Sequence, residues 1–174
     1  MPPKKFSIVG RAAPENDLLL DPEVSRKLSE MVGAAPWVAD MDWEEVVGLT
    51  AYLHVREYQE GQVIFQEGDV EPYMGIILGG VVEITKKDQK DEADKSLVRM
   101  GPGRAFGEFA LIDGEPRSAS ARARQKAKLL VLTRANLLRL SGENKHLAFK
   151  LVFNVARMMS RRLRQTSERL VEYL

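Results

Sequence analysis

The most specific pattern in this sequence is Phe106-Gly107-Glu108-Phe109-Ala110-Leu111-Ile112-Asp113-Gly114-Glu115-Pro116-Arg117-Ser118-Ala119-Ser120. It brings a glycine, a carboxylate and an arginine into one short segment that is bracketed by small residues. A guanidinium can donate two hydrogen bonds to one phosphate, and a carboxylate can accept a hydrogen bond from a sugar hydroxyl. The segment therefore predicts a site for a ligand that combines a sugar with a phosphate.

Each residue of this segment suits one part of such a ligand. Arg117 is the candidate for the phosphate, because the small Ser118 and Ala119 leave backbone N–H groups accessible beside it. Glu108 is the candidate for a ribose hydroxyl, and Gly107 lets the ligand approach the backbone at the start of a short helix. Taken singly, the same residues also have ordinary interpretations: a turn at Gly107, a surface position for Arg117, or a salt bridge between Glu108 and Arg117.

The composition is that of an ordinary globular protein with a hydrophobic core. The chain has 174 residues, of which 44% are hydrophobic and 29% charged, and its net charge is +1. This length fits one domain with an appendage, and this charge indicates no bulk attraction to nucleic acid or to a membrane. The apolar runs fall short of the ~18 residues that a membrane span needs, and no apolar segment follows the basic N-terminus as in a secretory signal.

The sequence lacks the residues that several classes of chemistry require. The sequence has no cysteine, and its two histidines, His54 and His146, are far apart. It therefore predicts no disulfide, no thiol chemistry and no metal site, and it disfavours a histidine-rich barrel enzyme of the cupin type. No Gly-x-Ser-x-Gly elbow or phosphate-binding loop with a lysine is present. We expect a protein that is no enzyme, that needs no cofactor or metal, and that works in the reducing cytoplasm.

The chain is expected to divide into an N-terminal extension, residues 1–41, and a main domain, residues 42–174. Within the extension, Asp21 and Pro22 predict the cap and first position of a short helix that ends after about Met31.

The main domain begins with a helix and continues as a β protein. Asp42-Trp43-Glu44-Glu45 resembles a capping box and predicts a helix to about Thr50. Short β-rich runs separated by glycine-bearing turns follow: Leu53–Tyr58, Gln62–Phe65, Tyr73–Leu78, Val81–Thr85, Ser96–Met100, Ser120–Ala123 and Lys128–Thr133. Strands at this spacing predict a barrel or sandwich over about residues 53–133.

The last part of the chain, about residues 134–173, is predicted to be helical. Thr133 can cap a helix from Arg134 to Leu140 that ends near Ser141-Gly142, and a long helix then runs from about Asn144 to Tyr173. A heptad-like seam follows one face of this long helix: Val152, Ala156, Met159, Leu163, Thr166, Leu170 and Tyr173. A second, offset stripe consists of Leu147, Leu151, Val155 and Met158. One stripe can cover the β domain while the other pairs with a second copy, so the pattern favours a homodimer.

Beyond these residue-level arguments, the segment from Phe106 to Ser120 resembles the phosphate-binding cassette of cyclic-nucleotide-binding domains, and in particular the sensor domains of catabolite activator proteins. The family pattern is Phe-Gly-Glu-x-Ala-Leu followed by Pro-Arg-x-Ala-Ser/Thr. The resemblance extends from about Asp42 to Leu174. It includes Gly61-Gln62-Val63-Ile64-Phe65-Gln66-Glu67-Gly68-Asp69, Gly101-Pro102-Gly103, and Arg161-Arg162-Leu163-Arg164-Gln165-Thr166-Ser167-Glu168-Arg169. One departure is Arg104, where the family commonly has an acidic residue.

The resemblance implies a mainly β fold with flanking helices. It would be an eight-stranded antiparallel, jelly-roll-like barrel with an N-terminal helix and a long C-terminal dimerisation helix. The implied ligand-binding residues are Gly107, Glu108, Phe109, Ala110, Arg117, Ser118, Ala119, Leu97, Val98, Arg162, Thr166 and Ser167. In this reading Leu97 and Val98 line the base pocket, and Arg162 lies near Glu108 and the ribose.

The resemblance also implies that Thr166 and Ser167 contact the amino group of adenine, the serine from the other subunit. A polar residue such as Thr166 inside an apolar seam has a second interpretation, as a residue that sets the register of a coiled coil. Ser118, the hydroxyl residue after the cassette arginine, is compatible with cyclic GMP as well as cyclic AMP. Thr166-Ser167 favours cyclic AMP.

The leading hypothesis is a non-enzymatic cyclic-AMP receptor that signals through movement of its C-terminal helix to a downstream protein partner that the sequence does not name. A second hypothesis is the sensor fragment of a cyclic-AMP-responsive transcription factor without its DNA-binding domain, since a helix-turn-helix would follow the long helix and the sequence ends at Leu174. We expect neither DNA binding nor membrane binding from this chain alone. A cyclic-GMP-binding module, and an interaction module that has lost its ligand, are further alternatives.

Overall fold

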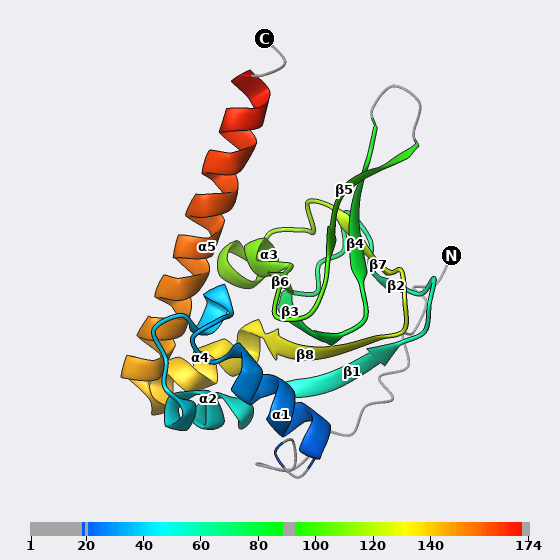
Figure 1. Ribbon diagram of the computed structural model, residues 1–174. Helices are drawn as coiled ribbons and strands as arrows, with labels where there is room; N and C mark the ends of the chain where they lie inside the picture. Colours follow the sequence, from blue (N-terminus) through cyan, green and yellow to red (C-terminus); the bar gives the residue numbers. More distant parts are fainter. Residues whose placement is uncertain (1–18, 20, 89–92, 172–174) are drawn as a thin grey trace, which may run out of the picture.

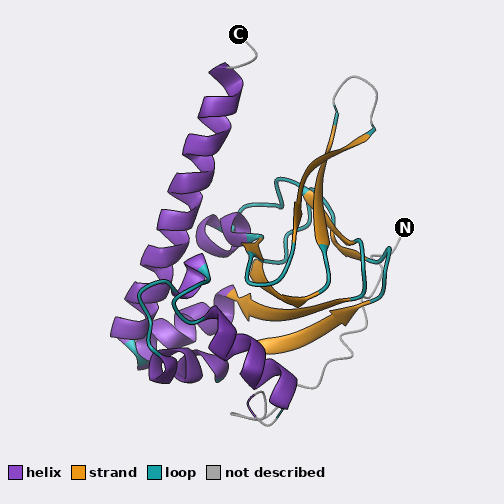
Figure 2. Cartoon of the chain, in the orientation of Figure 1, coloured by secondary structure: helices purple, strands orange, loops and turns teal. Residues whose placement is uncertain are grey.

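The structure is a computed structural model that describes residues 19, 21–88 and 93–171, with helices gathered on one side of the molecule and strands on the other (Figures 1 and 2). The helical elements are α1 (Pro22–Met31), η2 (Pro36–Val38), α2 (Trp43–Thr50), α3 (Glu108–Asp113), α4 (Arg134–Glu143) and α5 (Lys145–Val171). The strands are β1 (His54–Tyr58), β2 (Val63–Phe65), β3 (Tyr73–Gly79), β4 (Val82–Lys87), β5 (Asp94–Met100), β6 (Ala105–Phe106), β7 (Ser120–Ala123) and β8 (Ala127–Thr133).

The strands form two antiparallel sheets rather than one closed barrel. One sheet has the order β1-β8-β3-β6 and the other the order β2-β7-β4-β5, with four strands in each. The eight strands and the flanking helices agree with the expected fold class, but the pairing between strands does not close into the single eight-stranded barrel that we expected. The two-residue β6, which the sequence pattern did not predict, extends the first sheet beside β3.

Two central strands are buried on both faces, which explains their nearly continuous apolar sequence. On β3, Met74 and Ile76 pack in the core beneath the helices, whereas Tyr73 and Ile77 pack in the core between the sheets. Because successive side chains of a strand point to opposite faces, this alternation makes the first sheet the middle layer of the molecule. The helices cover one of its faces and the second sheet covers the other.

The segment before Asp42 packs into the same core as the C-terminal helices. Asp21 caps α1 as expected, since its side chain accepts hydrogen bonds from the backbone of Glu23 and Val24. Leu28 of α1 and Trp37 of η2 are almost fully buried in the core beneath the helices. The boundary that we expect at residue 42 stays a prediction, and residues 1–18 lie outside the described part of the chain.

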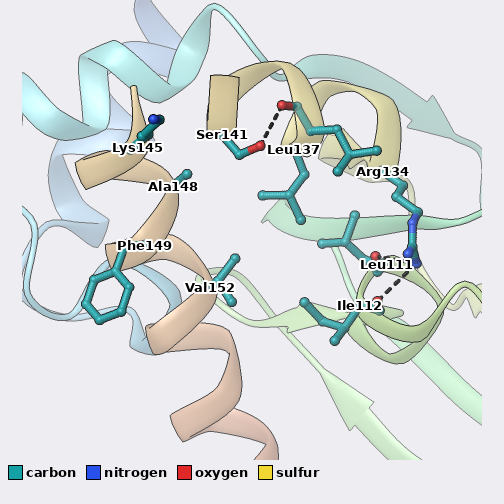
Figure 3. A pocket seen from close by; sticks show the side chains of 10 residues that line it. Leu111, Ile112, Arg134, Leu137, Ser141, Lys145, Ala148, Phe149 and Val152 are labelled. Carbon is teal, nitrogen blue, oxygen red and sulfur yellow. Dashed lines mark hydrogen bonds between the residues drawn. The ribbon is translucent and has the colours of Figure 1, made fainter. Parts of the chain in front are cut away.

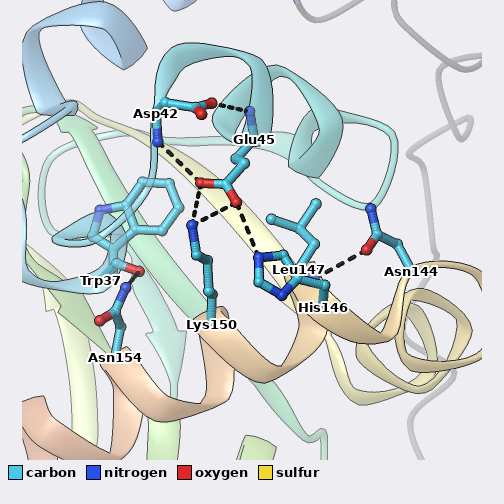
Figure 4. A network of polar contacts seen from close by, with 8 residues as sticks. All are labelled: Trp37, Asp42, Glu45, Asn144, His146, Leu147, Lys150 and Asn154. Atoms are coloured by element: carbon cyan, nitrogen blue, oxygen red, sulfur yellow. Dashed lines mark hydrogen bonds and ion pairs between the residues drawn. The ribbon is translucent and has the colours of Figure 1, made fainter.

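Polar contacts join α2 and η2 to the long helix (Figure 4). Asp42 and Glu45 form the predicted capping box of α2. Glu45 also accepts hydrogen bonds of 2.6 and 2.7 Å from Lys150 of α5, and Asn154 donates to the carbonyl oxygen of Trp37 at 3.4 Å. These contacts fix the N-terminal half of α5 against the domain.

The two predicted stripes of α5 differ in burial, although Met159 of the seam also packs against the core. Leu151 and Val155 of one stripe are each 1% exposed, whereas Val152 and Leu163 of the other are 39% and 68% exposed. The first stripe therefore covers the domain. Pairing of the exposed stripe with a second copy stays a prediction, and Tyr173 at its end lies outside the described residues.

The junction between α4 and α5 differs slightly from the expectation. α4 continues through Gly142 to Glu143 instead of ending near Ser141-Gly142. A glycine can stay in a helix when nothing requires the left-handed conformation there, and Asn144 then separates the two helices. Its side chain accepts a hydrogen bond from the backbone of Leu147 at 3.0 Å, so Asn144 caps α5.

Candidate functional site

Gly107 joins the short strand β6 to the helix α3 in a conformation that favours glycine. Its φ is 76°, in the left-handed region. A Cβ atom at this position would lie 2.7 Å from Nη1 of Arg117 and 3.1 Å from the carbonyl oxygen of Tyr73. The glycine therefore allows the arginine to approach the backbone, and the expected approach of a ligand to the same glycine stays a prediction.

Arg117 is buried at the centre of the cassette, with 4% of its surface exposed. Its Nη1 donates hydrogen bonds of 2.8 Å to the carbonyl oxygens of Tyr73 and Gly107. The guanidinium carbon lies 4.0 Å from the ring centre of Phe65 and 4.3 Å from that of Tyr73. Two aromatic faces and two carbonyl groups thus hold one edge of the guanidinium in place.

The other edge of the same guanidinium is buried without a hydrogen-bond acceptor among the residues that the structure describes. Nε and Nη2 of Arg117 are the two nitrogens concerned. Their hydrogens form the parallel fork that binds two oxygens of a phosphate or carboxylate. Burial lowers the pKa of Arg117, yet an arginine stays charged at neutral pH, so this edge offers a fixed positive charge to an anion.

The loop that carries Arg117 is tied to the turn after β2. The backbone N–H of Arg117 donates to the carbonyl oxygen of Asp69, and the N–H of Gly68 donates to the carbonyl oxygen of Arg117, both at 2.8 Å. Nζ of Lys86 donates to the carbonyl oxygen of Ser118 at 2.6 Å. Ser118 is exposed and Ala119 half-buried, so the backbone beside the guanidinium edge carries only small side chains.

Glu108 begins α3 and is held by the long helix. It is 2% exposed, and its carboxylate accepts a hydrogen bond from Nη1 of Arg162 on α5. Nη2 of Arg162 donates to the carbonyl oxygen of Ala105 on β6. The structure thus brings Gly107 and Arg117 together in one contact and Glu108 and Arg162 together in another.

The residues expected to line a base pocket lie on the exposed edge strand β5. Leu97 and Val98 are 53% and 45% exposed. Val98 pairs with Ile84 and Ser96 with Thr85, so Leu97 is left without a partner residue and β5 bulges at this point. Bulges often redirect side chains beside functional sites.

The remaining expected residues lie on α3 and α5. Phe109 is 45% exposed and Ala110 is buried. Thr166 and Ser167 are exposed, and their hydroxyls donate to the carbonyl oxygens of Arg162 and Leu163 at 3.0 Å. In this chain the two hydroxyl residues therefore contact their own helix, one turn beyond the arginine that holds Glu108.

An apolar groove of about 470 Å³ separates α3 from the C-terminal helices (Figure 3). Leu111 and Ile112 of α3, Leu137 and Leu138 of α4, and Val152 of α5 line it. Elsewhere in the described ranges, no group of three or more His, Asp or Glu side chains is placed to hold a metal ion, and no helix is long and apolar enough to cross a membrane.

Sequence reasoning missed the aromatic pair that encloses Arg117. Phe65 and Tyr73 lie on β2 and β3, more than 40 positions before the arginine. Their positions in apolar strands mark them as core residues, but only the folded structure shows that both rings face the guanidinium.

Comparison with known proteins identifies the family. A model of the cyclic nucleotide-binding domain matches residues 55–144, slightly more than half of the chain. The chain belongs to the cyclic nucleotide-binding domain family. The matched residues include both sheets except His54, together with the whole cassette, so the motif identified from sequence lies inside the matched domain.

This cyclic nucleotide-binding domain is similar to regulators of known structure. A cyclic AMP receptor protein from Thermus thermophilus is 34% identical over 122 residues, which cover 70% of this chain and 54% of the relative. The crystal structure of the Thermus thermophilus catabolite activator protein has a TM-score of 0.72 at 30% identity and covers 80% of this chain and 63% of that chain. A cyclic nucleotide-binding domain from Methylobacillus flagellatus has a TM-score of 0.77 at 27% identity, with 86% and 83% covered. The chain thus spans about half the length of the Thermus receptor.

Proposed function

We propose that this chain is a non-enzymatic receptor whose ligand is cyclic AMP. The observation that carries the proposal is the free edge of Arg117, Nε and Nη2, in a buried position. Leaving such donors without an acceptor costs free energy, about 1–3 kcal/mol for each group, and a phosphate would recover it. A cyclic phosphodiester supplies one negative charge and two oxygens of suitable spacing for this fork.

The ribose is assigned to Glu108. A carboxylate accepts the hydrogen bond of the 2′-hydroxyl, and Arg162 holds this carboxylate in place from α5. Glu108 directly follows Gly107 in the chain, and Nη1 of Arg117 donates a hydrogen bond to the Gly107 carbonyl oxygen, so Glu108 and the guanidinium lie on either side of this glycine. A sugar and its cyclic phosphate can therefore bind side by side.

The base is assigned to the space between β5 and α5. Leu97 and Val98 offer apolar surface from the bulged strand, and Thr166 and Ser167 offer hydroxyls from the long helix. Each hydroxyl donates to its own helix and retains lone pairs, which can accept a hydrogen bond from the adenine amino group. This favours cyclic AMP. Cyclic GMP remains the alternative ligand, because Ser118 offers an exposed hydroxyl near the phosphate.

Signalling is assigned to movement of α5, in a homodimer formed through its exposed stripe. Arg162 lies on α5 and binds Glu108, so a nucleotide that engages Glu108 acts directly on a contact of this helix. A ligand shifts a helix only by favouring one arrangement over another. Val152 and Leu163 supply the apolar surface that a second α5 would cover. A downstream protein would then respond to the changed position of α5.

A second candidate function is the sensor part of a cyclic-AMP-responsive transcription factor. The observation that favours it is coverage: this chain aligns with 63% of the Thermus catabolite activator protein chain. Under this alternative the nucleotide site is the same, and a DNA-binding domain would receive the movement of α5.

Calorimetric titration with cyclic AMP, cyclic GMP and 5′-AMP tests the proposal. We expect the tightest binding for cyclic AMP, weaker binding for cyclic GMP, and the weakest for 5′-AMP, whose doubly charged, open phosphate does not match the site. Tighter binding of cyclic GMP would mean that the chain is a receptor for cyclic GMP instead of cyclic AMP. Absence of heat and of thermal stabilisation with both cyclic nucleotides at millimolar concentration would refute the proposed function.

A further inference from the structure

The cassette helix α3 is too short to be stable without help at its ends. It has six residues, and its N-cap, Gly107, supplies no side-chain hydrogen bond. Isolated helices shorter than about 12 residues are marginal in water because nucleation is costly. Two arginines from the C-terminal helices reach its two ends: Arg162 binds Glu108 at the start, and Arg134 binds the last turn.

Arg134 is the first residue of α4 and caps the C-terminal end of α3. Its Nη1 donates to the carbonyl oxygen of Ile112 at 3.0 Å and more weakly to that of Leu111 at 3.4 Å (Figure 3). A cation is favoured at a helix C-terminus, where carbonyl groups lack partners. The backbone N–H of Arg134 donates to the carbonyl oxygen of Pro72 at 2.9 Å, so this arginine is itself anchored next to β3.

Gly114 makes this close approach possible. It ends α3 in the left-handed conformation with φ of 76°. A Cβ atom there would lie 2.8 Å from Nη1 of Arg134. The end of α3 is therefore shaped around the guanidinium of Arg134.

Leu111 of α3 packs in the core beneath the helices, but the apolar groove leaves space beside Ile112, which is 36% exposed. Leu111 and Ile112 form one wall of this groove, and Leu138 and Val152 belong to the opposite walls. Arg134, which also lines the groove, joins α3 to α4 across it. A helix beside open space can shift unless such a contact holds it.

We propose that Arg134 is a positioning residue for the nucleotide site. It holds α3 against α4 and keeps Gly107 and Glu108 in place at the other end of α3. This inference rests on the proposed function, since it assigns Gly107 and Glu108 to the ligand.

The binding test compares Arg134→Met and Arg134→Lys with the wild-type chain. Methionine keeps an unbranched apolar side chain and removes the hydrogen bonds, whereas lysine can still donate to one carbonyl. We expect cyclic-AMP affinity to fall by about three- to tenfold in Arg134→Met, since the contact is charged but partly exposed, and to recover in part in Arg134→Lys. Arg104→Met, at an exposed arginine on the loop before β6, serves as the control with unchanged affinity.

Amide hydrogen exchange without added nucleotide gives a readout that does not depend on ligand binding. In Arg134→Met we expect faster exchange at the end of α3, including the Gly114 N–H that donates to the Ala110 carbonyl oxygen, with unchanged exchange in β8. Unchanged exchange in α3 would overturn the proposal. So would a loss of thermal stability without any change in affinity, because a merely structural contact behaves in this way. If the wild-type chain bound no cyclic nucleotide, the proposed function would fail, and the exchange of α3 would still test the contact made by Arg134.

Discussion

Arg117 has two edges with different roles. Nη1 is used within the protein, where it donates to the carbonyl oxygens of Tyr73 and Gly107. Nε and Nη2 are without an acceptor in the part of the chain that the structure describes. One side chain thus connects the stability of the cassette with its capacity to bind an anion.

Substitution of Arg117 by lysine tests the planar fork separately from the positive charge. Arg117→Lys keeps the positive charge but loses the planar fork, so we expect cyclic-AMP affinity to fall by about tenfold or more. Arg117→Ala also removes the charge and should weaken binding by about tenfold to a hundredfold at least. Calorimetry on folded variants measures both effects, and wild-type affinity in Arg117→Ala would exclude this arginine from the site.

Substitution of Gly107 tests the backbone geometry of the cassette. In Gly107→Ala the left-handed φ costs about 1–2 kcal/mol, and the new methyl group displaces Arg117. We expect lower thermal stability together with weaker cyclic-AMP binding.

The matched control is Gly142→Ala. This glycine lies inside α4, and a Cβ atom there would meet nothing within 4 Å. We expect unchanged or slightly raised stability and unchanged binding, since alanine is the better helix former. Equal behaviour of the two alanine variants would contradict the geometric argument.

Sequence reasoning was most informative for residues that lie together in the chain. Gly107, Glu108 and Arg117 could be selected as candidate site residues because one short motif contains them all. Phe65 and Tyr73 could not be assigned to the guanidinium, because strand pairing brings them there from distant positions. Arg134 likewise gave no signal, since an arginine at the start of a helix is usually exposed.

At the level of elements, periodicity and capping predicted most helices and strands. The capping box at Asp42 and the cap at Asp21 are both present. The strand β6 was missed because two residues are too few to show alternation, and α4 extends past Gly142 because the helix tolerates that glycine.

The ion pair between α2 and α5 predicts a specific dependence of stability on pH. The hydrogen bond from Lys150 lowers the pKa of Glu45 in the folded protein. The stabilisation from this pair is therefore complete above the ordinary carboxyl pKa, about 4.3, and is lost as the pH falls through the lowered value. In Glu45→Gln we expect the free energy of unfolding to fall by about 1 kcal/mol at pH 7, and the difference from wild type to shrink as the pH falls below about 4.3 and through the lowered pKa of Glu45.

Chemical denaturation at several pH values measures this difference. Glu44→Gln is the control, because Glu44 is an exposed carboxylate on the same turn of α2. A difference for Glu45→Gln that persists in acid, or an equal effect in the control, would contradict the assignment.

At the scale of the whole molecule, the sequence predicted a β domain with flanking helices, but its turn spacing alone did not predict whether the strands close into a barrel. Turn spacing indicated a barrel or sandwich, and the pairing shows two four-stranded sheets. The burial of Leu28 and Trp37 in the core with α5 could not be read from residues 22–41, because their apolar positions do not specify which surface they cover.

The exposed stripe of α5 predicts self-association. Leu163→Glu would place a charge in the interface that we propose, so this variant should sediment as a monomer at concentrations where the wild-type chain is a dimer. Gln165→Glu, about 160° from Leu163 around the helix after two steps of about 100° each, is the control and should remain dimeric. A wild-type chain that is monomeric at high micromolar concentration with cyclic AMP bound would refute the dimer.

A crystal structure of the chain with cyclic AMP tests the central claim most directly. The account predicts phosphate oxygens within hydrogen-bond distance of both Nε and Nη2 of Arg117, with the ribose 2′-hydroxyl on the carboxylate of Glu108. A nucleotide bound at another surface, or one in the cassette whose phosphate does not contact Arg117, would contradict it.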